Sequence, residues 1–201
     1  MRKAITHLKK SDAAMGAVIA RVGPFRINYR EPKFDALARS IVFQQLNGTA
    51  AGTIYGRFEA ACGARGVTPD GVLKLRLPRM RSAGLSAQKS EYLRDLARRT
   101  RDGEIDFAAL PAMDDEAVIE ALTRVKGVGV WTAQMFLIFA LRRADVLPTA
   151  DYGIRAAMKK VYGLAELPKP PEMEKIAEPW RPWASVACWY LWRSLDGGAE
   201  L

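Results

Sequence analysis

The sequence predicts an all-α fold. Apolar residues recur at helical spacing over most of the 201-residue chain, and no stretch alternates with the period of two that marks a β-strand. Clusters of proline, glycine and aspartate separate the helical segments, for example at 68–71 and 167–171. We therefore expect about ten short helices joined by short loops.

Six segments carry the clearest helical patterns. Residues 86–99 begin with Ser86, a residue type favoured just before a helix. Residues 114–122 have acidic side chains in their first turn, where they suit the positive end of the helix dipole. Residues 130–141 are apolar on nearly all sides, which is typical of a buried helix. The other three segments are 33–46, 152–162 and 184–195.

Composition limits the class of protein. With 49% hydrophobic residues, a chain of this length can bury a core without disulfides or metals. No apolar run is long enough to cross a membrane, and the first residues lack the apolar segment of a signal peptide, so we expect a cytoplasmic protein. Cys62 and Cys188 are too few and too far apart in sequence for a disulfide framework or a metal motif.

The charge points to a polyanionic partner. Lysine and arginine number 31 against 22 acidic residues, which gives a net charge of +9. Such a balance suits nucleic acid or an acidic membrane surface. The single histidine, His7, excludes a histidine-based zinc site and leaves catalysis to carboxylates, lysine, tyrosine or the backbone.

The stretch TRVKGVGVWTAQM (123–135) places a turn between two expected helices. Gly127 and Gly129 allow positive φ angles and a close approach by another group. Amides at the start of the next helix, around Val130 and Thr132, would face an anion such as a phosphate, with Lys126 beside it. A glycine that simply ends one helix before an ordinary turn explains the same letters.

Together with its neighbours, this stretch resembles a helix–hairpin–helix motif. The chain also contains IVFQQLNGTAA at 41–51, Pro-Thr-Ala-Asp at 148–151 and WRPWASVACWYLW at 180–192. In this order the motifs are similar to those of the helix–hairpin–helix–Gly/Pro–Asp superfamily of base-excision DNA glycosylases, in particular its 3-methyladenine DNA glycosylase II branch. The resemblance covers roughly residues 30–195.

The resemblance implies two helical lobes that flank a DNA-binding cleft. Residues 33–145 would form one lobe, with the helix–hairpin–helix motif at about 118–141. Residues 1–32 and 146–201 would form the other, and the two would act as one catalytic unit. The implied activity is base excision repair of alkylation damage, by hydrolysis of the N-glycosidic bond of purines such as 3-methyladenine and 7-methylguanine. The implied partner is double-stranded DNA with damaged bases, bound by a monomer at the bacterial nucleoid and not at a membrane, with the damaged base flipped out.

Asp151 precedes the expected helix 152–162, and from local sequence it is a typical helix N-cap. The resemblance assigns the catalytic carboxylate to the same position. The two roles are compatible because the helix dipole favours the ionised form. An ionised carboxylate can stabilise positive charge on the sugar and orient or deprotonate water. We expect Asp114 and Asp145 to face solvent.

Trp131 stands where bifunctional members carry a lysine that attacks the sugar, so the resemblance implies a monofunctional enzyme that uses water. From local sequence alone, core packing at a helix start is the better explanation of this tryptophan. An aromatic pocket would attract a cationic alkylated purine through stacking and cation–π contacts. The implied pocket residues are Trp131, Tyr152, Trp183, Met135 and Phe43. Plain core positions are expected for Trp180, Trp189 and Trp192.

A side chain must fill the gap that the flipped base leaves. The resemblance places it near Ala87, which is smaller than the apolar residue that family members often carry there. Leu85 and Gln88 are the neighbouring candidates. Gln44 and Gln45 are further gap-filling candidates, and these two glutamines either contact the DNA or tie loops together.

The remaining implied contacts involve the backbone of the hairpin. DNA phosphates would be bound by Lys126, Gly127, Gly129, Val130 and Thr132. No cofactor would be required for the reaction. A structural Na⁺ or K⁺ would be held by the carbonyls of Thr123, Val125 and Val128.

Three other interpretations stay open at this stage. A helix–hairpin–helix module that only grips DNA would need no carboxylate. A glycosylase with lyase activity towards oxidised bases would need an amine, for which Lys126 is the only nearby candidate. A basic helical scaffold without a DNA role would show no salt-dependent DNA binding.

Overall fold

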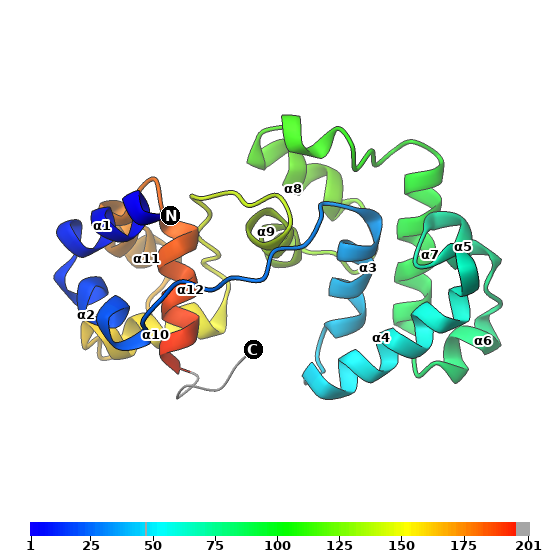
Figure 1. Ribbon diagram of the computed structural model, residues 1–201, viewed down its shortest axis with the longest axis horizontal. Coiled ribbons are helices and arrows are strands. Elements are labelled where there is room, and N and C mark those ends of the chain that lie inside the picture. Colours follow the sequence, from blue (N-terminus) through cyan, green and yellow to red (C-terminus); the bar gives the residue numbers. More distant parts are fainter. Residues whose placement is uncertain (47, 196–201) are drawn as a thin grey trace. The chain divides into compact units, whose positions relative to one another are not determined.

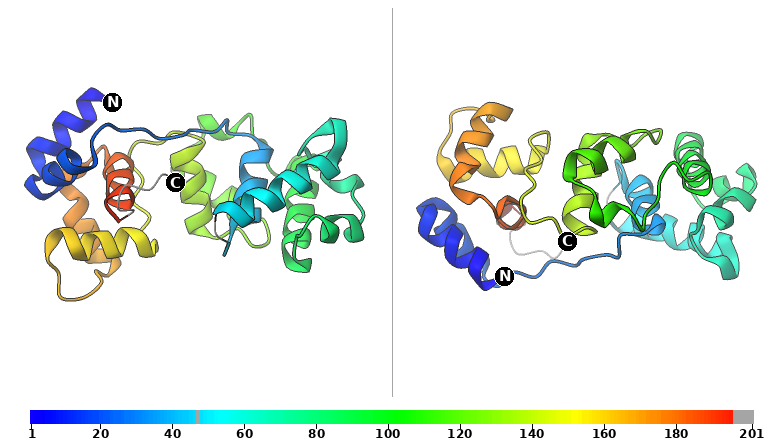
Figure 2. Two further views of the ribbon diagram at one scale, coloured as in Figure 1. Left: turned by 60° about the horizontal axis from the view of Figure 1, so that its bottom comes forward. Right: turned by 90° about the horizontal axis from the view of Figure 1, so that it is seen from above.

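The structure is a computed structural model that describes residues 1–46 and 48–195. These residues form helices and connecting loops and contain no strand (Figure 1). Two further views in Figure 2 show the same helical build. The all-α prediction is confirmed, with twelve α-helices and three short 3-10 helices in the described ranges rather than about ten helices in all.

The chain divides into two compact units. Unit 1 comprises residues 1–29 and 142–201, of which 196–201 lie outside the described residues. Unit 2 comprises residues 30–141, whereas the sequence analysis placed the boundaries at 33 and 145.

Unit 1 contains the helices from both ends of the chain. They are α1 (Arg2–Ser11), α2 (Ala13–Val22), α10 (Tyr152–Tyr162), α11 (Pro170–Ala177), η3 (Glu178–Trp180) and α12 (Ala184–Leu195). Helix α12 packs against α1, α2 and α10, and its residues 184–191 are all buried. A core of this unit therefore surrounds the helix that carries the last part of the WRPWASVACWYLW motif.

Unit 2 contains the hairpin and the residues around it. Its helices are α3 (Phe34–Phe43), α4 (Gly48–Cys62), η1 (Gly63–Arg65), α5 (Pro69–Lys74), α6 (Leu77–Ser82), α7 (Ala87–Arg101), η2 (Leu110–Ala112), α8 (Asp115–Thr123) and α9 (Val130–Phe139). Helix α3 packs against α4, α7 and α9 through an apolar face that includes Leu37 and Ile41, both fully buried. Asn47, within the IVFQQLNGTAA segment, lies outside the described residues.

Helix caps explain where the functional segments begin. Ser86 accepts the amide of Lys89 and caps α7, as the sequence predicts. Asp114 caps α8 from an exposed position. The expectation that Asp145 faces solvent was wrong, because this residue is partly buried. Its carboxylate accepts the amide of Ala184 at the start of α12 and pairs with Arg181 at 3.1 Å.

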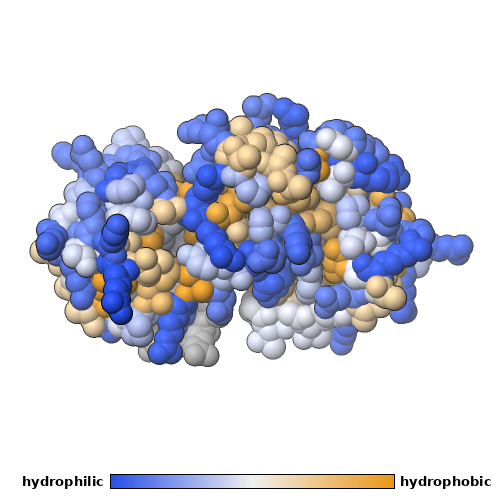
Figure 3. Space-filling model, turned by 45° about the horizontal axis from the view of Figure 1, so that its top comes forward, coloured by the Kyte–Doolittle hydropathy of each residue, from blue (hydrophilic) through white to orange (hydrophobic). Residues whose placement is uncertain are grey.

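The surface of the protein is mostly hydrophilic on the side that Figure 3 shows. On the face drawn in Figure 3, hydrophilic side chains cover most of the surface and hydrophobic ones show between them. No helix in the described ranges is long and apolar enough to cross a membrane.

Candidate functional site

The hairpin joins α8, which ends at Thr123, to α9, which begins at Val130. Gly127 has a φ of 77°, in the left-handed region that favours glycine. A Cβ atom at this position would lie 2.1 Å from the ring of Tyr92 on α7. Gly129 has a φ of −95° and is the N-cap of α9, so this second glycine does not use the positive φ that glycine allows. Only Gly127 is required for the turn and for a close approach.

Replacing Gly127 with alanine is expected to lower the free energy of unfolding by about 3 kcal/mol, from the left-handed φ and the overlap with the Tyr92 ring. Thermal unfolding followed by calorimetry measures this loss. Gly129→Ala is the matched control, because its φ is ordinary and nothing lies within 4 Å of the added carbon. Equal losses in the two variants would contradict the structural difference between the glycines.

Helix α7 fastens the hairpin through its acidic side chains. The carboxylate of Asp95 is 5% exposed and accepts the backbone amide of Lys126 at 3.0 Å. It also accepts bonds from Arg98 and Arg99. Burial by itself raises the pKa of Asp95, but the Lys126 amide and the Arg99 guanidinium outweigh it and hold the pKa below its ordinary value.

Lys126, an expected phosphate ligand, already has two partners within unit 2. Its amide already donates to Asp95, and its ammonium donates to Glu91 at 2.6 Å in an exposed pair. The hydrogen bond to Glu91 raises the pKa of Lys126. The amide does not face a ligand, and a phosphate would have to compete with Glu91 for the side chain.

The first turn of α9 presents a different surface. Val130 is 53% exposed, and Gly129 is exposed as well. The first amides of a helix have no carbonyl partner within that helix, and the positive end of the dipole lies behind them. Thr132, in the same turn, is buried. These are general features of helix starts that bind anions.

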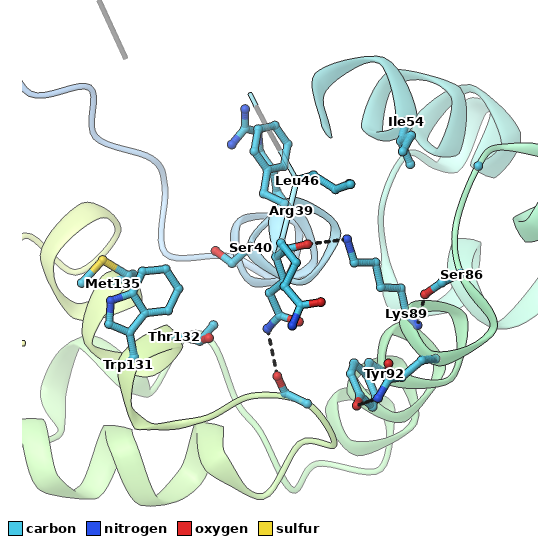
Figure 4. Close-up of a pocket in the computed structure, with 16 residues that line it drawn as sticks. Arg39, Ser40, Leu46, Ile54, Ser86, Lys89, Tyr92, Trp131, Thr132 and Met135 are labelled. Atoms are coloured by element: carbon cyan, nitrogen blue, oxygen red, sulfur yellow. Dashed lines mark hydrogen bonds between the residues drawn. The ribbon is translucent and has the colours of Figure 1, made fainter. Parts of the chain in front are cut away.

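A pocket of about 990 Å³ opens beside this turn within unit 2 (Figure 4). Trp131, Thr132 and Met135 of α9 line one side of it, and Lys89 and Tyr92 of α7 line the other. The side chain of Trp131 is 41% exposed, so this tryptophan is not a core residue. Phe43 also lines the pocket. Three of the five expected base-pocket residues, Trp131, Met135 and Phe43, thus come together.

Arg39 covers one face of the Phe43 ring in this pocket. Its guanidinium carbon lies 3.5 Å from the centroid of the Phe43 ring, a cation–π contact. Burial and the neighbouring charge of Arg30 lower the pKa of Arg39. The ring face that Arg39 covers is closed to a cationic base, which leaves Trp131 as the exposed aromatic wall.

The turn after α3 is tied to both neighbouring elements. The side-chain amide of Gln44 donates to the carbonyl of Gly127 at 2.9 Å, so Gln44 ties two loops together. Gln45 is exposed and has a φ of 56°. The ammonium of Lys89 donates to the carbonyls of Val42 and Gln44, each at 2.7 Å, and Figure 4 draws the bond to Gln44. Burial lowers the pKa of Lys89.

Lys89 was not among the predicted site residues. The prediction that Lys126 is the only nearby amine was wrong, because Lys89 lines the same pocket as Trp131. Nothing in the local sequence LSAQKSEY distinguishes this lysine from its solvent-facing neighbours. Its role depends on a contact with residues more than 40 positions away.

The candidate gap-filling residues separate by exposure. Leu85 was a wrong candidate, because its side chain is 1% exposed and belongs to the core of unit 2. Ala87 and Gln88 are exposed at the start of α7, and Gln88 donates to the Tyr92 hydroxyl at 2.6 Å. Gln45 is also exposed.

The carboxylate of Asp151 is built into unit 1. It is 8% exposed, and its Oδ1 atom accepts the amide of Ile154 at 2.7 Å, which confirms the predicted N-cap of α10. The same oxygen accepts the indole N–H of Trp192 at 2.9 Å. The prediction of a plain core position for Trp192 was wrong, because this side chain is only partly buried and orients a carboxylate.

The residues around the Asp151 carboxylate are closely packed. A Cβ atom at Gly153 would lie 3.1 Å from both Asp151 Oδ1 and Trp192 Cδ1. Cys188 is fully buried, and burial together with the Asp151 charge raises the pKa of its thiol. Tyr152 is 71% exposed, whereas Trp183 is partly buried against the core of unit 1.

The predicted ligands of a Na⁺ or K⁺ ion are backbone carbonyls of the hairpin. The carbonyl of Val125 already accepts the amide of Val128 at 3.0 Å, although a carbonyl oxygen has a second lone pair. The described residues contain no group of three or more histidine, cysteine, aspartate or glutamate side chains that could hold a metal. A cation at this turn would therefore depend on backbone oxygens.

Comparison with known proteins identifies relatives along nearly the whole chain. Residues 38–182 match the HhH-GPD superfamily of base excision DNA repair proteins. DNA-3-methyladenine glycosylase 1 of Schizosaccharomyces pombe is 33% identical over 200 residues, which cover 96% of this chain and 87% of that protein.

Two solved structures are similar in fold. The first is the S. pombe 3-methyladenine DNA glycosylase in complex with abasic DNA, with a TM-score of 0.84, 33% identity and coverage of 94% of this chain and 95% of that one. The second is the DNA-3-methyladenine glycosidase of Bacillus halodurans, with a TM-score of 0.85, 34% identity and coverage of 96% and 89%.

Proposed function

The chain belongs to the HhH-GPD superfamily of base excision DNA repair proteins, and we propose that it is a monofunctional DNA glycosylase for alkylated purines. Its substrate would be double-stranded DNA that contains 3-methyladenine, 7-methylguanine or a related weakened base. The enzyme would act as a monomer and would need no cofactor for the reaction, with a Na⁺ or K⁺ at the hairpin carbonyls as a structural addition.

The observation that carries this proposal is the buried carboxylate of Asp151. Two N–H donors, from Ile154 and Trp192, bind its Oδ1 atom and fix its orientation. When the bond between C1′ and the base nitrogen breaks, positive charge develops on the sugar, and a fixed carboxylate stabilises it. Water then adds to C1′, and Asp151 orients it or accepts its proton. The products are a free base and an abasic site.

The pocket in unit 2 suits a flipped cationic purine. The exposed Trp131 ring offers a stacking surface with cation–π attraction, and Met135 adds a polarisable apolar wall. An alkylated purine already carries the charge that lets it leave, so a site without a general acid beside the base suffices. Phosphates flanking the flipped nucleotide would meet the first turn of α9.

Water is the proposed nucleophile because neither nearby amine is placed for attack. Lys89 donates to two backbone carbonyls, and Lys126 pairs with Glu91. Trp131 itself has no amine. Among the candidates for the gap-filling side chain, Gln45 is favoured by its exposure and its position at the tip of the turn that Lys89 holds.

Base release from methylated duplex DNA tests the function. We expect free 3-methyladenine or 7-methylguanine by chromatography, and DNA strands that stay intact until alkali is added. Strand cleavage without alkali would replace this proposal with a glycosylase/lyase. DNA binding without release of any methylated or deaminated purine would leave only a DNA-binding module.

A further inference from the structure

Basic charge is concentrated at the corner of unit 2 formed by α4, α5 and α6. Residues 57–82 contain five arginines and one lysine against only Glu59 and Asp70. This segment of 26 residues thus carries +4 of the net charge of +9. Neither the hairpin nor the pocket beside it accounts for these charges.

Two arginines at this corner, Arg57 and Arg79, differ from several arginines elsewhere in the unit, which pair with carboxylates. Arg98 and Arg99 pair with Asp95, and Arg124 pairs with Glu120. Arg57 and Arg79 are exposed and have no carboxylate within ion-pair distance among the described residues. Unpaired guanidinium groups at a surface are available to an anionic ligand.

Arg57 and Arg79 flank one hollow of about 250 Å³. Its floor is made by small side chains, so backbone and ligand can approach closely. The other lining residues are Ala60, Ala61, Ser82 and Ala83. The two guanidinium groups come from different helices, α4 and α6, and can bind one anion from two sides.

The hollow adjoins the larger pocket along the same two elements. Ile54 and Gly84 line the larger pocket, while Arg57 and Ala83 line the hollow. Three residues of an α-helix span about 5 Å, so Arg57 lies roughly one turn beyond Ile54 on α4. A Cβ atom at Gly84 would lie 3.0 Å from Cγ1 of Ile54, which shows that α4 and the turn after α6 are in contact.

We propose that this hollow binds a backbone phosphate of the DNA duplex outside the damaged nucleotide. The proposal rests on the glycosylase function, because it takes the DNA to lie across the larger pocket. Each strand carries a phosphate about every 3.4 Å along the duplex axis, so a phosphate within a few base pairs reaches the hollow. Bidentate guanidinium groups match phosphate oxygens in geometry and charge. The contact reads no sequence and extends the grip on the duplex.

Salt dependence of binding tests this site. The variant Arg57→Gln/Arg79→Gln is compared with wild type by fluorescence anisotropy, on a duplex with a stable abasic analogue and about ten base pairs on each side. We expect the slope of log K against log salt to become shallower by about 0.9, the value for one lost phosphate contact.

The matched control is Arg21→Gln/Arg26→Gln, which removes the same charge from exposed positions of unit 1. An unchanged slope for Arg57→Gln/Arg79→Gln, or an equal change in the control, would overturn the proposal. The rate of base release at saturating protein should stay at the wild-type value in the variant. A wild type that releases no base, with the slope change still present, would overturn the glycosylase function and leave the phosphate site standing.

Discussion

The variant Asp151→Asn is expected to lose base release by roughly 10²–10³-fold while it stays folded. Asparagine keeps a side-chain oxygen for the amide of Ile154 and the indole of Trp192, and it is as good an N-cap as aspartate. It lacks the negative charge that stabilises the sugar and the basicity that activates water. Single-turnover release from methylated DNA measures the loss, and thermal unfolding should show a change in stability below about 0.5 kcal/mol.

Two further variants show which property of Asp151 matters. Asp151→Ala removes the cap as well and should cost about 1 kcal/mol of stability in addition to the activity. Trp192→Phe keeps the carboxylate but removes one of its donors, so the rate should fall by about tenfold, the factor that corresponds to a hydrogen bond worth about 1.4 kcal/mol. Wild-type activity in Asp151→Asn would eliminate this carboxylate from the mechanism.

The variant Lys89→Met is expected to lose both stability and DNA affinity. Methionine keeps the apolar stem but leaves the carbonyls of Val42 and Gln44 without their charged donor, which should cost about 2 kcal/mol. The hydrogen bond from Lys89 to the carbonyl of Gln44, the residue before Gln45, is then lost. The φ of 56° at Gln45 already costs about 1 kcal/mol. We expect the turn to relax, and affinity for abasic duplex to fall by about tenfold. Calorimetry and anisotropy measure the two effects.

Lys126→Met is the matched control for Lys89→Met. Lys126 belongs to the same unit, and its ion-pair partner Glu91 is as exposed as the lysine itself. Removing this amine should therefore lower the free energy of unfolding by no more than about 0.5 kcal/mol. Lys89→Arg restores a donor and should recover part of the DNA affinity. Equal effects of the two methionine variants would contradict an anchoring role. Borohydride trapping of wild type on abasic DNA that disappears in Lys89→Met would reassign Lys89 as a nucleophile.

Local sequence was sufficient where a structural rule acts within a few residues. Ser86 and Asp151 are N-caps because each side-chain oxygen accepts an amide three residues later. The spacing of apolar residues predicted the all-α fold class correctly. The GVG turn between α8 and α9 also lies where the sequence predicts it. The order in which the short motifs follow one another along the chain also indicated the superfamily, and the family comparison then showed the same superfamily.

Long-range contacts decided what the sequence left open or misjudged. The two glycines of GVG look equivalent in sequence, but only Gly127 faces the ring of Tyr92, 35 positions earlier in the chain. Leu85 stood among the gap-filling candidates and proved to be core, because burial depends on how α6 and α7 pack. Two glutamines side by side differ in the same way, since Gln44 reaches Gly127 while Gln45 stays exposed.

The sequence by itself determined the helical class, the caps, the basic charge and the absence of a lysine at Trp131, since these follow from residue type and local spacing. Only the tertiary structure decided that Trp192 holds Asp151, that Lys89 anchors the glutamine turn, and that Arg57 and Arg79 flank one hollow. Each of these joins residues from different helices. Their side chains come into contact because the core of each unit brings its helices together. The spacing of residues along the chain does not predict such contacts.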